Sequence, residues 1–172
     1  MTVNFNDDLP LLRAHVAARV EAQSHVDEPI SAVQVGFRLV QACLVVFYFD
    51  TRELHDRDGQ WDFDEPTLEL PHWNEAFEAA EEDGLSCVLL SGERLDLPAG
   101  TDEETVAAIF GQTLLAVALD ATAAGSFDAL PLRDDCQLDL EEFDGLWAWP
   151  PTYDAVGRSN LLHALPALRL PG

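Results

Sequence analysis

The acidic side chains within residues 54–65 have the spacing that comes nearest to a metal site. With Gly59 at the sixth position of a twelve-residue calcium loop, Asp56 and Asp58 take positions three and five, and two further acids take positions nine and twelve. The first position fails because Leu54 has no oxygen ligand, and a proline follows where a second helix is needed. We therefore interpret the segment as a solvated acidic hairpin loop and predict no metal; a weak calcium site is the alternative.

Catalytic side chains show no comparable pattern. The histidines have neither H-x-x-x-H nor H-E-x-x-H spacing; they are His15, His25, His55, His72 and His163. Ser91 lacks the flanking glycine of a nucleophile elbow, and Cys87 is predicted to lie within a strand among valine and leucine, where a thiol is usually inert. The sequence also has no glycine-rich phosphate loop. We therefore expect a protein that is not an enzyme and that needs no cofactor.

Cysteine usage and the amino terminus bear on the compartment. Cys43, Cys87 and Cys136 are 44 and 49 residues apart, and an odd number without a close pair argues against a disulfide framework and a zinc knuckle. The first residues have no basic stretch followed by an apolar one, which a secretory signal requires. The sequence thus predicts reduced thiols and a cytoplasmic location.

The charge balance is strongly acidic and includes no lysine: nine arginines oppose 32 acids, for a net charge of −23. Seventeen of the acids fall within residues 51–105. Nucleic acid is a poor partner for such a chain, because phosphates are contacted by clusters of Lys and Arg. The longest uninterrupted apolar run, residues 42–49, has eight residues against the roughly 18 of a membrane span, so we predict no membrane partner either.

Periodicity and helix-breaking residues outline the elements that must position these side chains. The expected helices span residues 8–25, 71–82 and 101–125, with a short one near 161–165, and the expected strands span 31–40, 42–49, 85–91, 136–140 and 146–149. Asp7 or Asp8 is the expected cap of the first helix, and Thr101 with Glu104 forms a capping box for the third. Gly84 is the expected end of the second helix.

The two early strands differ in their patterns. Alternating apolar and small or polar residues make residues 31–40 a half-buried strand, whereas residues 42–49 are apolar on both faces and belong inside the sheet. Together the elements predict a single α+β domain over residues 1–172. It has a mixed or antiparallel sheet of about four to six strands packed with about three to four helices.

Tryptophan adds a second feature to the acidic middle of the chain. Trp73 belongs to the core face of its predicted helix, whereas Trp61 stands among the acids of the loop. Trp147 and Trp149 share one face of a predicted strand. Tryptophan anchors surrounded by charge are typical of protein-binding hot spots. The alternative is that all four tryptophans fill the core.

In size, charge and layout the chain resembles the small acidic immunity and antitoxin proteins of bacteria. The resemblance implies an inhibitor that neutralises a basic partner protein, such as a toxin, through an acidic surface. A concentrated negative field fits this role, because it accelerates capture of a cationic partner. The predicted partner-binding residues are Asp56, Asp58, Trp61, Asp62, Asp64, Glu65 and Glu69.

The alternative function is a small enzyme or ligand-binding domain whose acidity reflects its proteome. A GC-rich genome favours Arg over Lys codons, and a salt-adapted cytoplasm favours acidic surfaces that are poor in lysine. Both effects act on the whole chain, so the concentration of acids within residues 51–105 favours a local role. The sequence leaves the oligomeric state open.

Overall fold

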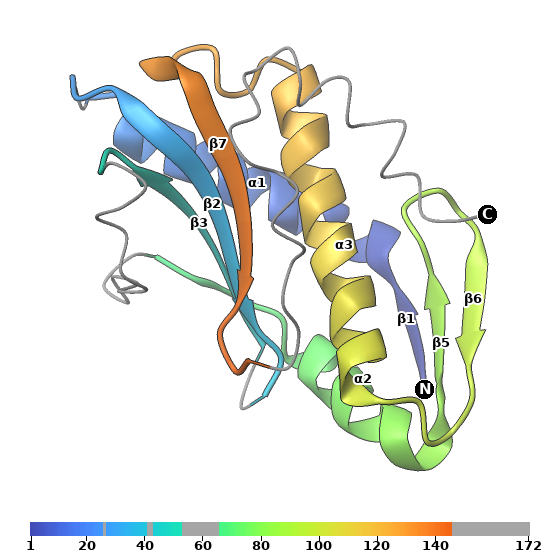
Figure 1. Cartoon of the computed structure of the whole chain (residues 1–172). Helices are drawn as coiled ribbons and strands as arrows, with labels where there is room; N and C mark the ends of the chain where they lie inside the picture. Colours follow the sequence, from blue (N-terminus) through green and yellow to red (C-terminus); the bar gives the residue numbers. More distant parts are fainter. Residues whose placement is uncertain (26, 41–42, 53–65, 146–172) are drawn as a thin grey trace.

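Three helices and seven strands make up the residues that the computed structural model describes, which are 1–25, 27–40, 43–52 and 66–145 (Figure 1). In chain order they are β1 (Thr2–Asn4), α1 (Phe5–Gln23), β2 (Ile30–Arg38), β3 (Leu44–Asp50), β4 (Leu68–Glu69), α2 (Pro71–Asp83), β5 (Leu85–Val88), β6 (Arg94–Leu97), α3 (Glu103–Ala123) and β7 (Leu132–Glu142). The α+β class that the sequence predicts is confirmed.

The strands form two mixed sheets. In the four-stranded sheet, with the order β4-β3-β2-β7, β2 runs antiparallel to β3 and parallel to β7. In the three-stranded sheet, with the order β1-β5-β6, β1 is parallel to β5 and β5 is antiparallel to β6. Figure 1 shows α3 between the two sheets, where it contacts β2, β7, α1 and α2. Since α1 also contacts β3 and β5, the helices join one sheet to the other.

The central strand of the larger sheet, β2, is buried on both faces. The face that packs against the helices is lined by Val33, Val35, Phe37, Val45, Phe47, Phe49, Leu138 and Leu140, all of which are buried. On the other face Phe143 covers Gly36, where an added Cβ would lie 2.2 Å from the phenyl ring. The prediction of a half-buried strand is therefore wrong, because only Gln34 and Arg38 of β2 are partly exposed. The interior position predicted for β3 is confirmed.

Three aromatic side chains, one from each helix, meet edge to face in the core. The Phe5 ring centroid lies 5.2 Å from those of both Trp73 and Phe110, and the latter two are 4.9 Å apart. All three side chains are fully buried. Such a pair contributes about 0.5–1.5 kcal/mol beyond the area that it buries. The prediction that Trp73 belongs to the core is confirmed.

Two helix starts differ from the predicted ones. Asn4 caps α1, so that Asp7 and Asp8 lie within the first turn instead of capping it. Asp102 caps α3, because its carboxylate, and not the Thr101 hydroxyl, accepts the free backbone N–H of the first turn. In both helices acids occupy the first turn, where the helix dipole stabilises negative charge.

The sequence predicts where α2 ends but does not predict the short edge strands. Gly84 ends α2 as predicted; its φ is 73°, and an added Cβ would lie 2.6 Å from the Leu97 carbonyl oxygen. Three strands that were not predicted, β1, β4 and β6, lie at sheet edges, where hydrogen bonds to a neighbouring strand hold them. The strand predicted at 146–149 and the helix near 161–165 lie outside the described residues.

The helix α3 is long and apolar enough to cross a membrane, with a mean hydropathy of 1.6 over its best 18-residue window. Within the fold, 72% of that window is buried against other elements. This burial is typical of the core helix of a globular protein.

One stripe of α1 places polar side chains against β3. The Arg19 Nε–H donates to the Phe47 carbonyl at 3.0 Å, and the His15 ring packs edge to face on the Phe47 ring. Burial, followed by the positive charge of Arg19, lowers the pKa of His15. The folded state therefore favours the neutral imidazole.

Replacing Gly36 with alanine should destabilise the fold by about 1–3 kcal/mol, because the new methyl group collides with the Phe143 ring. Phe143→Leu should relieve much of this loss when the two changes are combined. Urea unfolding of both single variants and the double variant measures the coupling. Additive losses of stability would show that Phe143 is not the obstacle.

Acidification should destabilise the protein through His15. Since the folded pKa lies below the unfolded value of 6.5, the unfolded chain binds more protons, and the free energy of unfolding falls as the pH drops below about 6.5. His15→Phe keeps an aromatic ring on Phe47 and should flatten this dependence. Urea unfolding at about pH 7.5 and 5.5 compares the two proteins. Equal pH dependence in both would contradict the assignment to His15.

Candidate functional site

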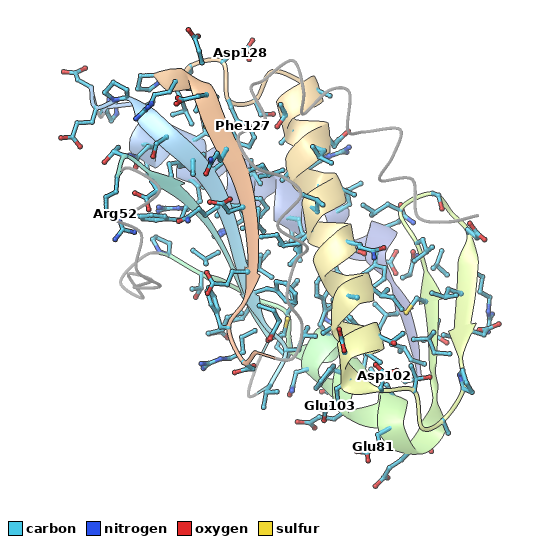
Figure 2. The ribbon with its side chains drawn as sticks, viewed as in Figure 1. Arg52, Glu81, Asp102, Glu103, Phe127 and Asp128 are labelled. Atoms are coloured by element: carbon cyan, nitrogen blue, oxygen red, sulfur yellow. The ribbon has the colours of Figure 1, made fainter. Side chains whose placement is uncertain are left out.

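Exposed acidic side chains gather where α2 meets the start of α3. We call this group the acidic end; its members are Glu75, Glu78, Glu81, Glu82 and Asp83 of α2 and Asp102, Glu103 and Glu104 at the start of α3. All eight residues are exposed. Figure 2 shows Glu81, Asp102 and Glu103 at this same end of the molecule.

Helical periodicity and a tight turn bring these acids together. One face of α2 is buried through Trp73, Ala76, Phe77 and Ala80, so the acids of this helix occupy the opposite face. The Gly100 N–H donates to the Glu81 carbonyl at 2.9 Å, which holds the turn before α3 against the last part of α2. As a result, the carboxyl-terminal half of α2 and the first turn of α3 present their acids to the same side.

The negative charge of the acidic end is not compensated within the described residues. None of the eight acids forms an ion pair with an arginine of the described ranges. The arginine ion pairs there are Arg13–Asp120, Arg38–Asp144, Arg52–Asp50, Arg94–Asp96 and Arg133–Asp135. Arg19 is buried and bonded to β3. The acidic end therefore projects an uncancelled negative potential into solvent.

Part of this charge sits where the local structure disfavours it. Glu82 and Asp83 lie in the last turn of α2, whose carbonyl groups make it the negative end of the helix dipole, and that turn has no basic residue. Acids at such a position destabilise a helix by about 0.3–1 kcal/mol each at low ionic strength. By contrast, Glu103 and Glu104 lie at the favourable end of α3. Glu82 and Asp83 thus give α2 no local stabilisation.

A groove of about 270 Å³ opens within the acidic end, between α2, α3 and the end of β2. Its lining combines the apolar side chains of Val40, Phe77, Ala80 and Val106 with the acidic side chains of Glu78, Glu81 and Glu103 and the hydroxyl-bearing Thr101. The apolar side chains form the floor of the groove and the carboxylates form its rim. Together they match a ligand that has an aliphatic stem and a cationic head.

The predicted partner-binding residues fall on both sides of the described boundary. Glu69 is exposed on β4, and one residue separates it from α2. The others lie outside the described residues: Asp56, Asp58, Trp61, Asp62, Asp64 and Glu65, together with Trp147 and Trp149. Sequence reasoning missed the acidic end as a site. Its signal was available, because the acids of α2 repeat three to four residues apart, opposite the apolar stripe.

A carboxylate–imidazole pair lies where α2 meets α1. Asp8 is buried, and one oxygen of its carboxylate accepts from the Trp73 indole N–H at 2.8 Å and lies 2.9 Å from His72 Nε2. In nucleophilic catalysis such a pair activates a thiol or hydroxyl in reach. Burial and the charge of Asp8 instead raise the pKa of the Cys43 thiol, which stays protonated and fully buried. We conclude that the pair holds α2 against α1.

The remaining candidates within the described ranges offer no metal or anion chemistry. No group of three or more His, Cys, Asp or Glu side chains is arranged there to hold a metal ion, and residues 54–65 lie outside those ranges. An open pocket of about 550 Å³ is lined by Glu28, Pro29, Thr51, Arg52 and Arg133. Both of its arginines are engaged, Arg52 with buried Asp50 and Arg133 with Asp135. The acidic end is therefore the stronger candidate site.

The bond between Asp8 and Trp73 should stabilise the fold measurably. Trp73→Phe removes the indole donor and should lower the free energy of unfolding by about 1–3 kcal/mol or more, because the buried carboxylate loses a partner. In a double-mutant cycle with Asp8→Ala, the two losses should be less than additive by at least about 0.5 kcal/mol. Urea unfolding provides the four free energies, and strict additivity would contradict the role of this bond.

Comparison of the chain with models of protein families, with curated proteins and with solved structures found no match.

Proposed function

We propose that this protein is a cytoplasmic binding protein that captures and neutralises a basic partner protein, in the manner of bacterial immunity and antitoxin proteins. The observation that carries the proposal is the acidic end: it has eight exposed acids with no arginine partner in the described ranges, and three of them line a groove with an apolar floor. A surface of one sign of charge with an apolar centre is suited to recognising a partner of opposite charge.

The charge acts first on the rate of encounter. An uncancelled negative field raises the association rate with a basic protein, and salt weakens the effect because it screens exposed charges within about 10 Å at 0.1 M. A nuclease-type partner would meet the acidic end with the surface that otherwise contacts phosphates. Occupying that surface would block its substrate, which is how an acidic protein can inhibit without chemistry.

The cysteines support the proposed compartment. Cys43, Cys87 and Cys136 are buried and form no disulfide, and burial raises the pKa of the Cys87 thiol to about 11. Thiols of this kind act as small apolar core residues and are stable in a reducing environment. Cytoplasmic location is therefore part of the proposal.

Charge reversal on α2 tests the function without threatening the fold. In the triple variant Glu75→Lys, Glu82→Lys and Asp83→Lys, two of the new lysines lie in the last turn of α2, where the helix dipole favours them, so the helix should not lose stability. Affinity capture from native cells at low salt should retain a basic partner in stoichiometric amount with the parent protein. The triple variant should associate with this partner at least about tenfold more slowly than the parent protein does.

The matched control places the same three reversals on exposed acids elsewhere: Glu21→Lys, Asp27→Lys and Asp134→Lys. The association rate of this variant should stay within about twofold of the parental rate. Raising NaCl from about 0.05 to 0.5 M should reduce the difference in association rate between the two variants. Equal losses in both variants, or the absence of a basic partner, would contradict the proposal. The second outcome is the one expected for an enzyme or ligand-binding domain with incidental charge.

A further inference from the structure

We infer that the groove at the acidic end is a socket for one arginine side chain of the partner, an inference that rests on the proposed function. The arginine socket is defined by an apolar floor of Phe77, Ala80 and Val106 and by the rim carboxylates of Glu81 and Glu103. The arginine's methylene stem would lie on the floor, and its guanidinium would lie between the two carboxylates.

The floor is preorganised by the core beneath it. Ala80 and Val106 are each 1% exposed and Phe77 is 8% exposed, so their backs are packed and little of each faces solvent. Phe77 and Ala80 lie one turn apart on α2, whereas Val106 lies one turn into α3. A floor of this kind can cover the apolar stem of a long cationic side chain while its head stays at the rim.

Backbone bonds position the two helix ends that carry the rim carboxylates, and both carboxylates stay available. The Gly100 N–H holds the Glu81 carbonyl, and the Asp102 cap fixes the turn from which Glu103 projects. Neither the Glu81 nor the Glu103 carboxylate has a hydrogen-bond partner among the described residues, whereas Glu78 accepts from the Asn74 amide at 3.2 Å. An incoming cation would therefore displace only water from Glu81 and Glu103.

The volume of the groove and the two carboxylates at its rim favour a single arginine side chain as its occupant. The groove holds about 270 Å³, just below the roughly 300–1,000 Å³ of small-molecule sites, so it suits one long side chain. Carboxylates that come from two different helices suit a planar guanidinium, whose five N–H donors form a fork, better than a compact and strongly hydrated ammonium. Arginine is also among the residues that most often dominate binding energy at interfaces.

The test uses the full chain and N-acetyl-arginine amide as the probe, followed by amide chemical shifts in NMR titrations. Shifts should concentrate at Phe77, Ala80, Val106 and the start of α3, with a dissociation constant on the order of millimolar. Glu81→Gln with Glu103→Gln should weaken binding about fivefold or more, because both charge-assisted bonds are lost. N-acetyl-lysine amide should bind the parent protein more weakly than the arginine probe.

A neighbouring pair of substitutions is the matched control. Glu82→Gln with Glu104→Gln removes the same charge from the next residue of each helix, outside the lining of the groove, and should leave the affinity within about 1.5-fold of the parent. Circular dichroism should show that both double variants are folded, since each loses one acid near the end of α2 and one at the start of α3. Equal weakening by the two pairs, or shifts spread over the acidic end without the floor residues, would overturn the socket. Either result leaves the triple lysine variant as a separate test of partner capture.

Discussion

The edge-to-face contact of Phe5, Trp73 and Phe110 ties the three helices together, and the position of α2 depends on it. The carboxylate of Asp8 reinforces it, because a buried charge must be paired and the Trp73 indole is one of its partners. With the Trp73 side of α2 held in the core, the acidic side is turned to solvent beside the start of α3. The surface that we propose for binding is thus a consequence of how one tryptophan is buried.

Titratable groups fall into two populations in this fold. The buried ones serve packing: Asp8 accepts from the Trp73 indole N–H, and Asp50 is fully enclosed and bonded by Arg52. Half-buried His15 packs on the Phe47 ring of β3, and its pKa is lowered. Each has a partner or a shifted titration that accounts for its burial. The exposed acids of α2 form no ion pair with an arginine of the described ranges, and they repel one another. Binding, rather than chemistry, is the use that such a surface supports.

The absence of lysine from the sequence leaves the negative charge on the outer face of α2 without a cationic neighbour on that face. On an ordinary helix, glutamates are commonly followed at four residues by lysines, and the pairs offset each other's charge. In α2 the turns that follow Glu75 and Glu78 contain further acids, and the last turn has no basic side chain to meet the helix dipole. The helix therefore relies on its buried face for stability, and its outer face is free to carry a charge density that only a cationic partner or salt can offset.

Periodicity in the sequence determined α2, α3, β2 and β3, and it placed Trp73 in the core, because each pattern is long enough to define a face. The role of Gly84 could also be predicted from the sequence, because glycine commonly takes the positive φ that ends a helix. The burial of β2 on both faces was not readable, because Gly36 looks like an exposed small residue until Phe143 is placed over it. The edge strands β1, β4 and β6 could not be predicted either, because each is too short to show a pattern and is held by its pairing with a neighbouring strand. The groove, too, was decided only by tertiary structure: Glu81 and Glu103 are 22 residues apart in sequence, with β5 and β6 between them. The backbone bond from Gly100, just before α3, to the Glu81 carbonyl brings their helices together.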